Sequence, residues 1–211
     1  RELEFADHVE RVVTRLYPRL GDNPDYTSIA SDRHYERLLS LIDDARRQGA
    51  QARFINPAAE ALEPARRKLA PTLLWNVPPT AAILTQEIFG PVLPILSYRT
   101  LEEAVVMINS RPRPLALYLF SHRKADVDFV LSRTRAGGVT LNDTLLHAAQ
   151  DGLPFGGIGE SGMGAYHGEA GFRTFSQARP LFQASRFSPA RLVRPPYGDR
   201  IDRLLRWLIG R

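Results

Sequence analysis

The chain has 211 residues, of which 44% are hydrophobic and 24% charged, a composition typical of an ordinary soluble globular domain. It contains no cysteine, which excludes disulfides, thiolate metal sites and a cysteine nucleophile within these residues. Its net charge of +5 is confined to residues 186–211, where seven arginines stand against two aspartates, while residues 1–185 balance to zero. Nucleic-acid-binding proteins usually spread basic charge along a face or groove, so this distribution does not predict a nucleic-acid partner.

Two amphipathic helices are predicted at the start of the chain. Apolar residues over 3–16 recur with helical spacing, and a second apolar stripe runs from Tyr35 to Ala45 behind a capping residue at Ser31 or Asp32. Short extended segments are expected next, at residues 52–55, 72–77 and 82–85.

From residue 92 onward the pattern alternates between strands and helices. Strands are expected over residues 92–98, 115–120 (buried) and 139–141. Between them, Thr100 and Glu103 form a capping box that opens a helix over 101–108, and Ser121 caps a helix that runs to about Arg135. This alternation is typical of a parallel sheet covered by helices, so the predicted fold class is α/β.

Beyond Leu146 the chain becomes rich in glycine and irregular, up to Gly171. Gly157–Gly162 matches the G-x-G-x-x-G pattern of dinucleotide-binding turns, but such a turn follows a strand and opens a helix, and the flanking residues predict neither. We interpret it as a loop that needs positive φ at several positions. The five histidines lack metal-ligand spacing, so no metal site is predicted.

A carboxylate and an aromatic ring stand two residues apart just before the strand expected at residue 92. In an extended chain Glu87 and Phe89 project to the same side, where they can present a carboxylate to a sugar diol and a ring face to a flat heterocycle. The alternative is that Phe89 belongs to the core and Glu87 is simply solvated.

Several motifs resemble those of the aldehyde dehydrogenase superfamily. Glu87–Pro91 is similar to its E-x-F-G-P motif, and Leu153–Gly164 to its P-F-G-G-x-x-x-S-G-x-G loop. Further segments follow family order or resemble the class 3 branch, at residues 114–121, 137–144, 166–168 and 172–176. Within that branch, and over nearly its whole length, the chain resembles the bacterial coniferyl aldehyde dehydrogenases.

The resemblance implies a fold and a set of site residues. The chain would be the carboxy-terminal, incomplete part of a catalytic domain over residues 1–185, followed by an Arg-rich tail over 186–211 that ends in a short amphipathic helix. Glu87 would bind the nicotinamide-ribose hydroxyls of NAD or NADP, and Phe89 would pack against the nicotinamide ring. Phe155 would line an aldehyde tunnel, and Asn142, His147 and His167 would lie near it as substrate-binding residues.

Family chemistry also needs groups that this chain lacks. A Cys thiolate attacks the aldehyde, the thiohemiacetal gives hydride to NAD(P), and a Glu base activates water to hydrolyse the thioester. Without a Cys or an E-L-G-G-K segment, the resemblance implies that both catalytic groups precede Arg1, and that the chain alone is inactive and binds NAD weakly. The parent would be a cytoplasmic homo-oligomer that oxidises an aldehyde, such as coniferyl or another aromatic aldehyde, to the acid.

The alternative function is a non-catalytic module whose basic tail binds a membrane surface or another anionic partner. The helix expected over 199–209 is too short to span a bilayer, although it can lie in the interface. We favour the interpretation in which Trp207 and the neighbouring leucines cover a groove on the parent enzyme.

Overall fold

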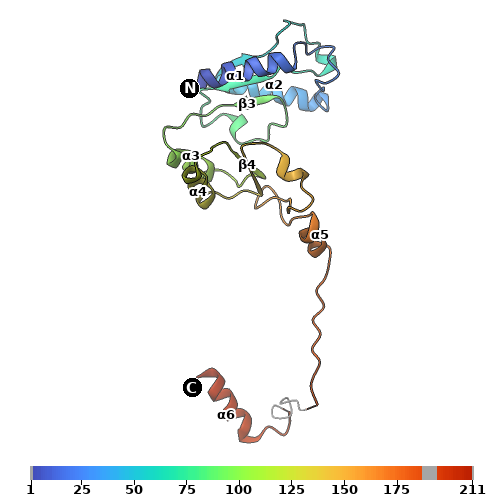
Figure 1. Cartoon of the computed structure of the whole chain (residues 1–211), viewed down its shortest axis with the longest axis vertical. Helices are drawn as coiled ribbons and strands as arrows, with labels where there is room; N and C mark the ends of the chain where they lie inside the picture. The colour runs from blue at the N-terminus through green and yellow to red at the C-terminus, as the bar shows by residue number, and fades with distance from the viewer. Residues whose placement is uncertain (1, 187–193, 211) are drawn as a thin grey trace. The chain divides into compact units, whose positions relative to one another are not determined.

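The computed structural model describes residues 2–186 and 194–210 and forms two compact units, Arg1–Ile108 and Asn109–Arg211 (Figure 1). The first unit contains most of the long helices and a three-stranded sheet. The second contains a smaller sheet, the glycine-rich region and the carboxy-terminal helix. The boundary expected near residue 185 lies inside the second unit and stays a prediction.

The first unit begins with the two helices that the apolar spacing predicts, α1 (Glu2–Leu16) and α2 (Asp32–Arg47). Ser31 is the N-cap of α2, and its hydroxyl accepts a hydrogen bond from the amide of His34 at 3.3 Å. The other elements are β1 (Gln51–Phe54), η1 (Pro64–Arg66), β2 (Thr72–Trp75), η2 (Ala82–Leu84), β3 (Val92–Pro94) and α3 (Leu101–Asn109), whose last residue begins the second unit. The strand order is β1–β2–β3, with β1 antiparallel and β3 parallel to β2.

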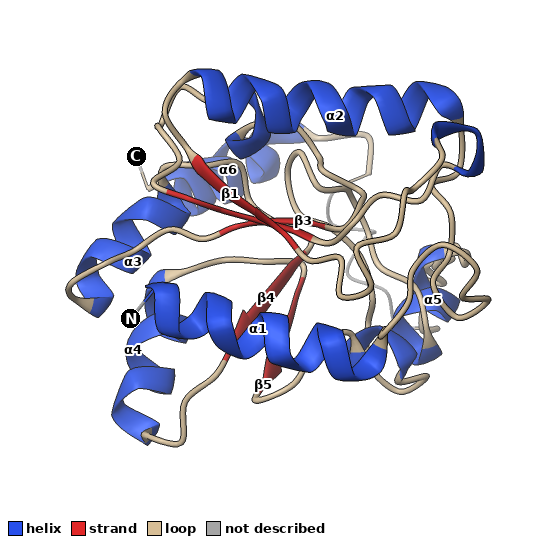
Figure 2. Ribbon diagram, turned by 90° about the horizontal axis from the view of Figure 1, so that it is seen from above, coloured by secondary structure: helices blue, strands red, loops and turns tan. Residues whose placement is uncertain are grey.

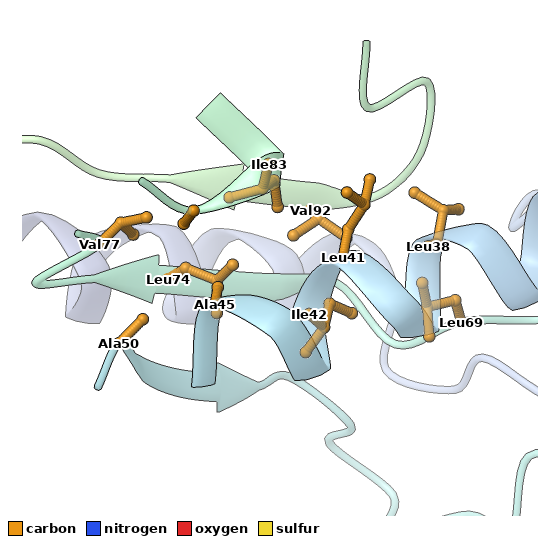
Figure 3. Close-up of a cluster of buried hydrophobic side chains, with 11 residues drawn as sticks. Leu38, Leu41, Ile42, Ala45, Ala50, Leu69, Leu74, Val77, Ile83 and Val92 are labelled. Carbon is orange, nitrogen blue, oxygen red and sulfur yellow. The ribbon is translucent and has the colours of Figure 1, made fainter. Parts of the chain in front are cut away.

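The two faces of this sheet are set by the alternation of residues along β2. Leu74 packs with the apolar side of α2, whereas Leu73 packs on the other face with Ala6 of α1. Successive residues of a strand project to opposite sides, so one short apolar strand supports both helices. The α2 side holds the larger core (Figure 3), made of Leu38, Leu41, Ile42, Ala45, Ala50, Leu69, Leu74, Val77, Ala81, Ile83 and Val92.

The second unit is built on a parallel pair of strands with a crossover helix. β4 (Ala116–Leu119) pairs in register with β5 (Gly138–Leu141), and α4 (Lys124–Arg133) connects them (Figure 2). Val130 is buried near the end of α4. The remaining elements are η3 (Leu146–Ala149), α5 (Gly168–Thr174) and α6 (Gly198–Ile209).

The α/β class is confirmed, but the sheet differs from the one expected over residues 92–141. β3 pairs with β2 and β4 pairs with β5, so the strands fall into two sheets. The strand expected over 92–98 ends at Pro94, where proline has no N–H to donate to a ladder. The strand expected to be buried over 115–120 is shorter, β4, and half-buried, and Leu115 and Phe120 on either side of it are exposed.

The segment at residues 82–85 forms a 3₁₀ turn, η2, rather than the expected extended run. Its first amide, that of Ala82, donates to the carboxylate of Asp44 on α2 at 2.9 Å. This contact joins residues far apart in sequence, so local propensity did not reveal it.

One helix cap is confirmed and another is wrong. The hydroxyl of Thr100 accepts from the amide of Glu103 at 3.3 Å at the start of α3, which is the first hydrogen bond of the expected capping box. The second differs, because the Glu103 carboxylate accepts from the amide of Arg99 at 2.8 Å and not from that of Thr100. Ser121 does not cap α4, which begins at Lys124; its hydroxyl accepts from the amide of Arg123 at 3.1 Å and so closes a turn before the helix. The expected helix end near Arg135 lies instead at Arg133.

Candidate functional site

The segment Glu87–Pro91 is an exposed loop with an unusual backbone at its aromatic residue. Phe89 has φ +48°, and the residue is 76% exposed. Left-handed backbone is rare for a bulky residue and persists only where neighbouring contacts impose it. The extended geometry expected for Glu87 and Phe89 is therefore wrong, and so is the alternative of a core position for Phe89. Glu87 is also exposed.

Helix α2 holds this loop with two adjacent side chains. The Arg37 guanidinium donates to the carbonyl oxygen of Glu87 at 2.6 Å and to that of Ile88 at 2.7 Å. Leu38, fully buried, packs so closely on Gly90 that a Cβ there would lie 2.5 Å from a Leu38 methyl group. The two guanidinium N–H groups of Arg37 thus fix the carbonyls of the two residues before Phe89. Gly90, the residue after Phe89, has no Cβ and so allows Leu38 to pack closely on the loop.

A cavity of about 360 Å³ lies beside the Phe89 ring. It is lined by Tyr26, Thr27, Ser28, Ile29, Ala30, His34, Phe89, Gly90 and Pro91. Burial, with a smaller effect from Tyr17, raises the pKa of Tyr26 to about 12, so its hydroxyl stays protonated near neutral pH and donates to the carbonyl of Leu69. The residues around the cavity therefore include apolar side chains, residues with hydroxyl groups, one histidine and the exposed Phe89.

Sequence reasoning missed the contribution of α2 to this site. Arg37 and His34 are three residues apart and so lie on one side of the helix, next to its apolar stripe. That spacing is the only signal in the sequence, and it does not reveal which loop the side chains meet.

In the second unit, three of the four residues expected in or near the aldehyde tunnel come together around one ring. The ring centroid of Phe155 lies 5.8 Å from that of His147 and 6.1 Å from that of His167. Tyr166 completes the cluster, 5.6 Å from Phe155 in an edge-to-face arrangement and 4.4 Å from His167. Phe155 and Tyr166 also exchange two backbone hydrogen bonds of 2.9 Å, which fix the chain on both sides of the glycine-rich loop.

The histidines contribute mostly as packed rings. His147 is buried, its Nδ1 lies 2.9 Å from the hydroxyl of Thr140, and its Nε2 has no hydrogen-bond partner among the described residues. Gly138 makes room for this ring, because a Cβ there would lie 2.4 Å from an imidazole carbon. The Nδ1 of His167 is likewise buried without a partner in the described chain.

Asn142 directly follows β5, and its side chain forms two hydrogen bonds with the backbone of Ser121. Its side-chain oxygen accepts from the amide of Ser121 at 2.9 Å, and its side-chain nitrogen donates to the carbonyl of Ser121 at 3.1 Å. The amide therefore holds the turn after β4. Its expected role beside the aldehyde tunnel stays a prediction.

The glycine-rich segment is a loop, as its flanking residues predict, and not a dinucleotide-binding turn. Gly159, Gly162 and Gly164 all have positive φ, and Gly159 bridges to Gly162 across the loop. The irregular stretch ends earlier than expected, because α5 begins at Gly168. Within residues 2–186 and 194–210, no group of His, Asp and Glu side chains could hold a metal ion.

Comparison with known proteins identifies the family. The model of the aldehyde dehydrogenase family matches residues 4–180. The chain belongs to the aldehyde dehydrogenase family. It is 50% identical over 202 residues to a probable coniferyl aldehyde dehydrogenase of Pseudomonas aeruginosa, covering 96% of this chain and 41% of that protein.

Solved structures of the same family have the same fold. The chain matches AldH of Staphylococcus aureus, solved in a substrate-bound state, with a TM-score of 0.75 and 37% identity over 96% of this chain and 44% of that one. It also matches succinic semialdehyde dehydrogenase of Streptococcus pyogenes, solved with NADP⁺, with a TM-score of 0.67 and 27% identity over 82% and 38% of the two chains. The chain thus spans about two fifths of the length of these relatives.

Proposed function

We propose that this chain supplies part of the cofactor site and of the aldehyde site of an NAD(P)-dependent aldehyde dehydrogenase that oxidises coniferyl or another aromatic aldehyde to the acid. The observation that carries the proposal is Phe89, which is exposed and has a left-handed backbone conformation. Arg37 binds the carbonyl of Glu87 in the same loop, and Phe89 lines a cavity. Strained residues of this kind gather at ligand sites, because the surrounding contacts must stabilise them.

On the cofactor side, the chain's own residues suit a nicotinamide nucleotide. Such a cofactor accepts a hydride from the substrate when it is bound. The Phe89 ring offers a flat face to the nicotinamide, and the Glu87 carboxylate accepts from both hydroxyls of a ribose diol. The two hydrogen bonds from Arg37 already hold the loop in place before the cofactor binds to Glu87 and Phe89. Less conformational entropy is therefore lost on binding.

On the aldehyde side, the cluster around Phe155 provides an aromatic wall. A ring of the substrate can stack on it or meet it edge-on, which favours aromatic over short aliphatic aldehydes. Phe155, His147 and His167 position the substrate in this proposal, and Asn142 holds the chain nearby.

The reactive groups lie outside these residues in the same proposal. The chain has no Cys, so the thiolate that attacks the aldehyde and the Glu that activates water belong to other parts of the enzyme. The chain alone is then inactive and binds NAD weakly. Exposed apolar residues such as Phe175, Leu181 and Phe182 support burial against the rest of the enzyme or a second subunit in a homo-oligomer.

A chimeric enzyme tests the proposal. The matching part of the Pseudomonas aeruginosa relative is replaced by this chain, and NADH or NADPH formation is followed with coniferyl aldehyde as substrate. We expect activity, and a folded chimera that reduces neither cofactor would overturn the proposal.

Two substitutions in the chimera then test the cofactor residues. Glu87→Gln weakens charge-assisted hydrogen bonds to the ribose, so kcat/KM falls about 10- to 100-fold, as expected for a loss of about 1.5–3 kcal/mol. Phe89→Ala raises the KM for the cofactor. The matched controls are Glu36→Gln, an exposed carboxylate on α2, and Phe54→Ala, a half-exposed ring on β1. Equal losses in the controls would show that the effects are not specific to the site.

A further inference from the structure

Two segments of the first unit line the cavity beside Phe89. One is the loop Glu87–Pro91, which α2 holds through Arg37. The other is the 27–30 segment, in the connection between α1 and α2. Residues 17–31, all of which the structure describes, contain no helix or strand, so no ladder of backbone hydrogen bonds fixes the 27–30 segment. Its position depends on contacts with another part of the chain.

Arg67 binds the 27–30 segment with both its backbone and its side chain. Its carbonyl oxygen accepts from the amide of Ile29 at 2.8 Å, and its Nε donates to the carbonyl oxygen of Ile29 at 3.0 Å. One arginine therefore binds both backbone polar groups of a residue that lines the cavity. The hydrogen bond from Nε is partly buried and has a charged donor, which makes it stronger than a bond between neutral groups.

The backbone of Arg67 is left-handed, with φ +50°. Glycine adopts this conformation without strain, whereas an arginine keeps it only where the surrounding contacts impose it. The contacts at this position include the two hydrogen bonds with Ile29. Phe89 in the other lining segment is also left-handed, so both segments of the cavity depend on a strained residue.

The two residues after the arginine hold the rest of the connection independently. Lys68 donates through Nζ to the carbonyl oxygens of Leu20 at 3.0 Å and of Asn23 at 2.7 Å. The carbonyl oxygen of Leu69 accepts from the hydroxyl of Tyr26. Loss of the arginine side chain should therefore release the 27–30 segment without releasing the start of the connection.

A further contact of the Arg67 guanidinium lies at the start of α2. Its Nη1 donates to the Asp32 carboxylate at 3.1 Å, but the Asp32 side chain is 79% exposed. An exposed ion pair contributes little to stability, because water screens it. The contact with Ile29 is therefore the one that fixes the cavity wall.

We propose that Arg67 is a positioning residue for the cofactor site, acting through Ile29 on the wall of the cavity beside Phe89. The inference rests on the proposed function, in which Phe89 packs on the nicotinamide of NAD or NADP. Arg67 touches neither the cofactor nor the reacting atoms. It keeps the 27–30 segment in the conformation that binds the cofactor, so less of the binding free energy is spent on ordering that segment.

Hydrogen exchange of the 211-residue chain tests the structural step and needs no activity. Arg67→Ala should make the Ile29 amide exchange about tenfold faster, the effect of losing one hydrogen bond to a charged group. The amide of Tyr26, which donates to the carbonyl oxygen of Asn23 at 3.3 Å, should exchange as before.

Kinetics of the chimeric enzyme test the consequence for the cofactor. Arg67→Ala should raise the KM for NAD or NADP about tenfold and leave kcat within about twofold, because the cofactor must order the wall before the reaction begins. Arg67→Gly should raise the KM equally, although it relieves the left-handed backbone and so lowers the melting temperature less than Arg67→Ala does. A residue that only stabilises the fold would not separate the KM from the stability in this way.

Two variants serve as controls in both experiments. Arg66→Ala removes the neighbouring arginine, whose partners Asp22 and Glu63 are exposed and lie outside the lining of the cavity. Asp32→Asn removes the ion pair at the start of α2 and keeps both hydrogen bonds to Ile29. Neither control should change the exchange of the Ile29 amide or the KM for the cofactor.

The outcomes separate this inference from the proposed function. An unsubstituted chimera without activity would overturn the proposed function and the inference with it. In an active chimera, an unchanged KM in Arg67→Ala would overturn the inference alone, as would unchanged exchange of the Ile29 amide in the 211-residue chain. A KM that rises in Arg67→Ala but not in Arg67→Gly would show that it follows stability, and an equal rise in Asp32→Asn would show that the arginine acts through α2. Either result would also overturn the inference.

Discussion

The two loops with the most specific family motifs are held by different kinds of contact. At Glu87–Pro91, side chains of another element hold the loop, since Arg37 donates to two of its carbonyls and Leu38 packs on Gly90. At Gly156–Gly164, backbone packs directly on backbone. A Cβ on Gly156 would lie 2.0 Å from the carbonyl oxygen of Gly164.

This difference determines how each loop tolerates change. A side chain can rotate or be replaced, so the first loop can be adjusted from α2 without changing its own residues. Backbone atoms cannot move away without moving the chain, so the second loop depends on its own glycines. We expect the first loop to respond to substitutions in α2 and the second to respond to any added Cβ.

The largest effect is expected for Gly157→Ala in the second loop. The new Cβ would lie 2.0 Å from the carbonyl oxygen of Ser161 and 2.5 Å from the amide nitrogen of Gly162, so the loop must open. We expect the free energy of unfolding to fall by about 3 kcal/mol or more, measured by denaturant titration. The matched control is Gly152→Ala, where a Cβ meets nothing within 4 Å. Equal losses in the two variants would contradict backbone packing as the cause.

A smaller effect is expected for Gly90→Ala in the first loop. Here the Cβ would lie 2.5 and 2.8 Å from the two methyl groups of Leu38, which is a side chain. We expect a loss of about 1–3 kcal/mol, and a loss at least about 1 kcal/mol smaller when Gly90→Ala is made in a Leu38→Ala background. A double-mutant cycle measures this coupling. Additive losses would show that the contact does not limit the loop.

Sequence patterns predicted those parts of the fold that depend on local periodicity. The apolar spacing of α1 and α2, the N-cap at Ser31 and the hydroxyl cap at Thr100 involve residues within a few positions of each other, and the structure confirms them. Gly157–Gly162 was interpreted correctly for the same reason, since the flanking residues show no strand before it and no helix after it.

The parts that sequence patterns missed depend on contacts between distant residues. Asp44 accepts a hydrogen bond from the first amide of the 3₁₀ turn at residues 82–84, across 38 positions. Arg37 donates to the carbonyl of Glu87 in the loop around Phe89, across 50 positions. Neither contact leaves a periodic signal. For the candidate site, the motifs predicted Glu87, Phe89, Phe155, His147 and His167, and their roles stay predictions. Only the structure showed that the Phe155 ring contacts both imidazoles and that the Asn142 amide binds Ser121.

A still smaller effect is expected for Arg37→Lys, which keeps the positive charge but removes the planar guanidinium that binds two carbonyls. Lysine can donate to one carbonyl of the pair but does not match both, so we expect the free energy of unfolding to fall by about 1–2 kcal/mol. Hydrogen exchange should increase in residues 87–91 and stay unchanged in residues 156–164. Arg33→Lys, an exposed arginine on the same helix, is the control. Faster exchange in both loops would indicate general destabilisation rather than release of the first loop.

The smallest effect is expected for Asp44→Asn, a third contact from α2 toward the same region. The amide of Ala82, and then the side chain of Gln48, donate to this carboxylate and hold its pKa below the usual range. Because the folded-state pKa is the lower one, the contribution to stability is fully present above about pH 4 and is lost as the pH falls through the lowered pKa. Asp44→Asn should therefore flatten the decline in thermal stability below about pH 4. The control Asp43→Asn removes a charge from the same helix without touching η2, and it should keep that decline. If both variants kept the decline in stability at low pH, the acid sensitivity would come from other carboxylates. Glu60 is the first candidate, because hydrogen bonds from the backbone amides of Leu20 and Gly21 also lower its pKa.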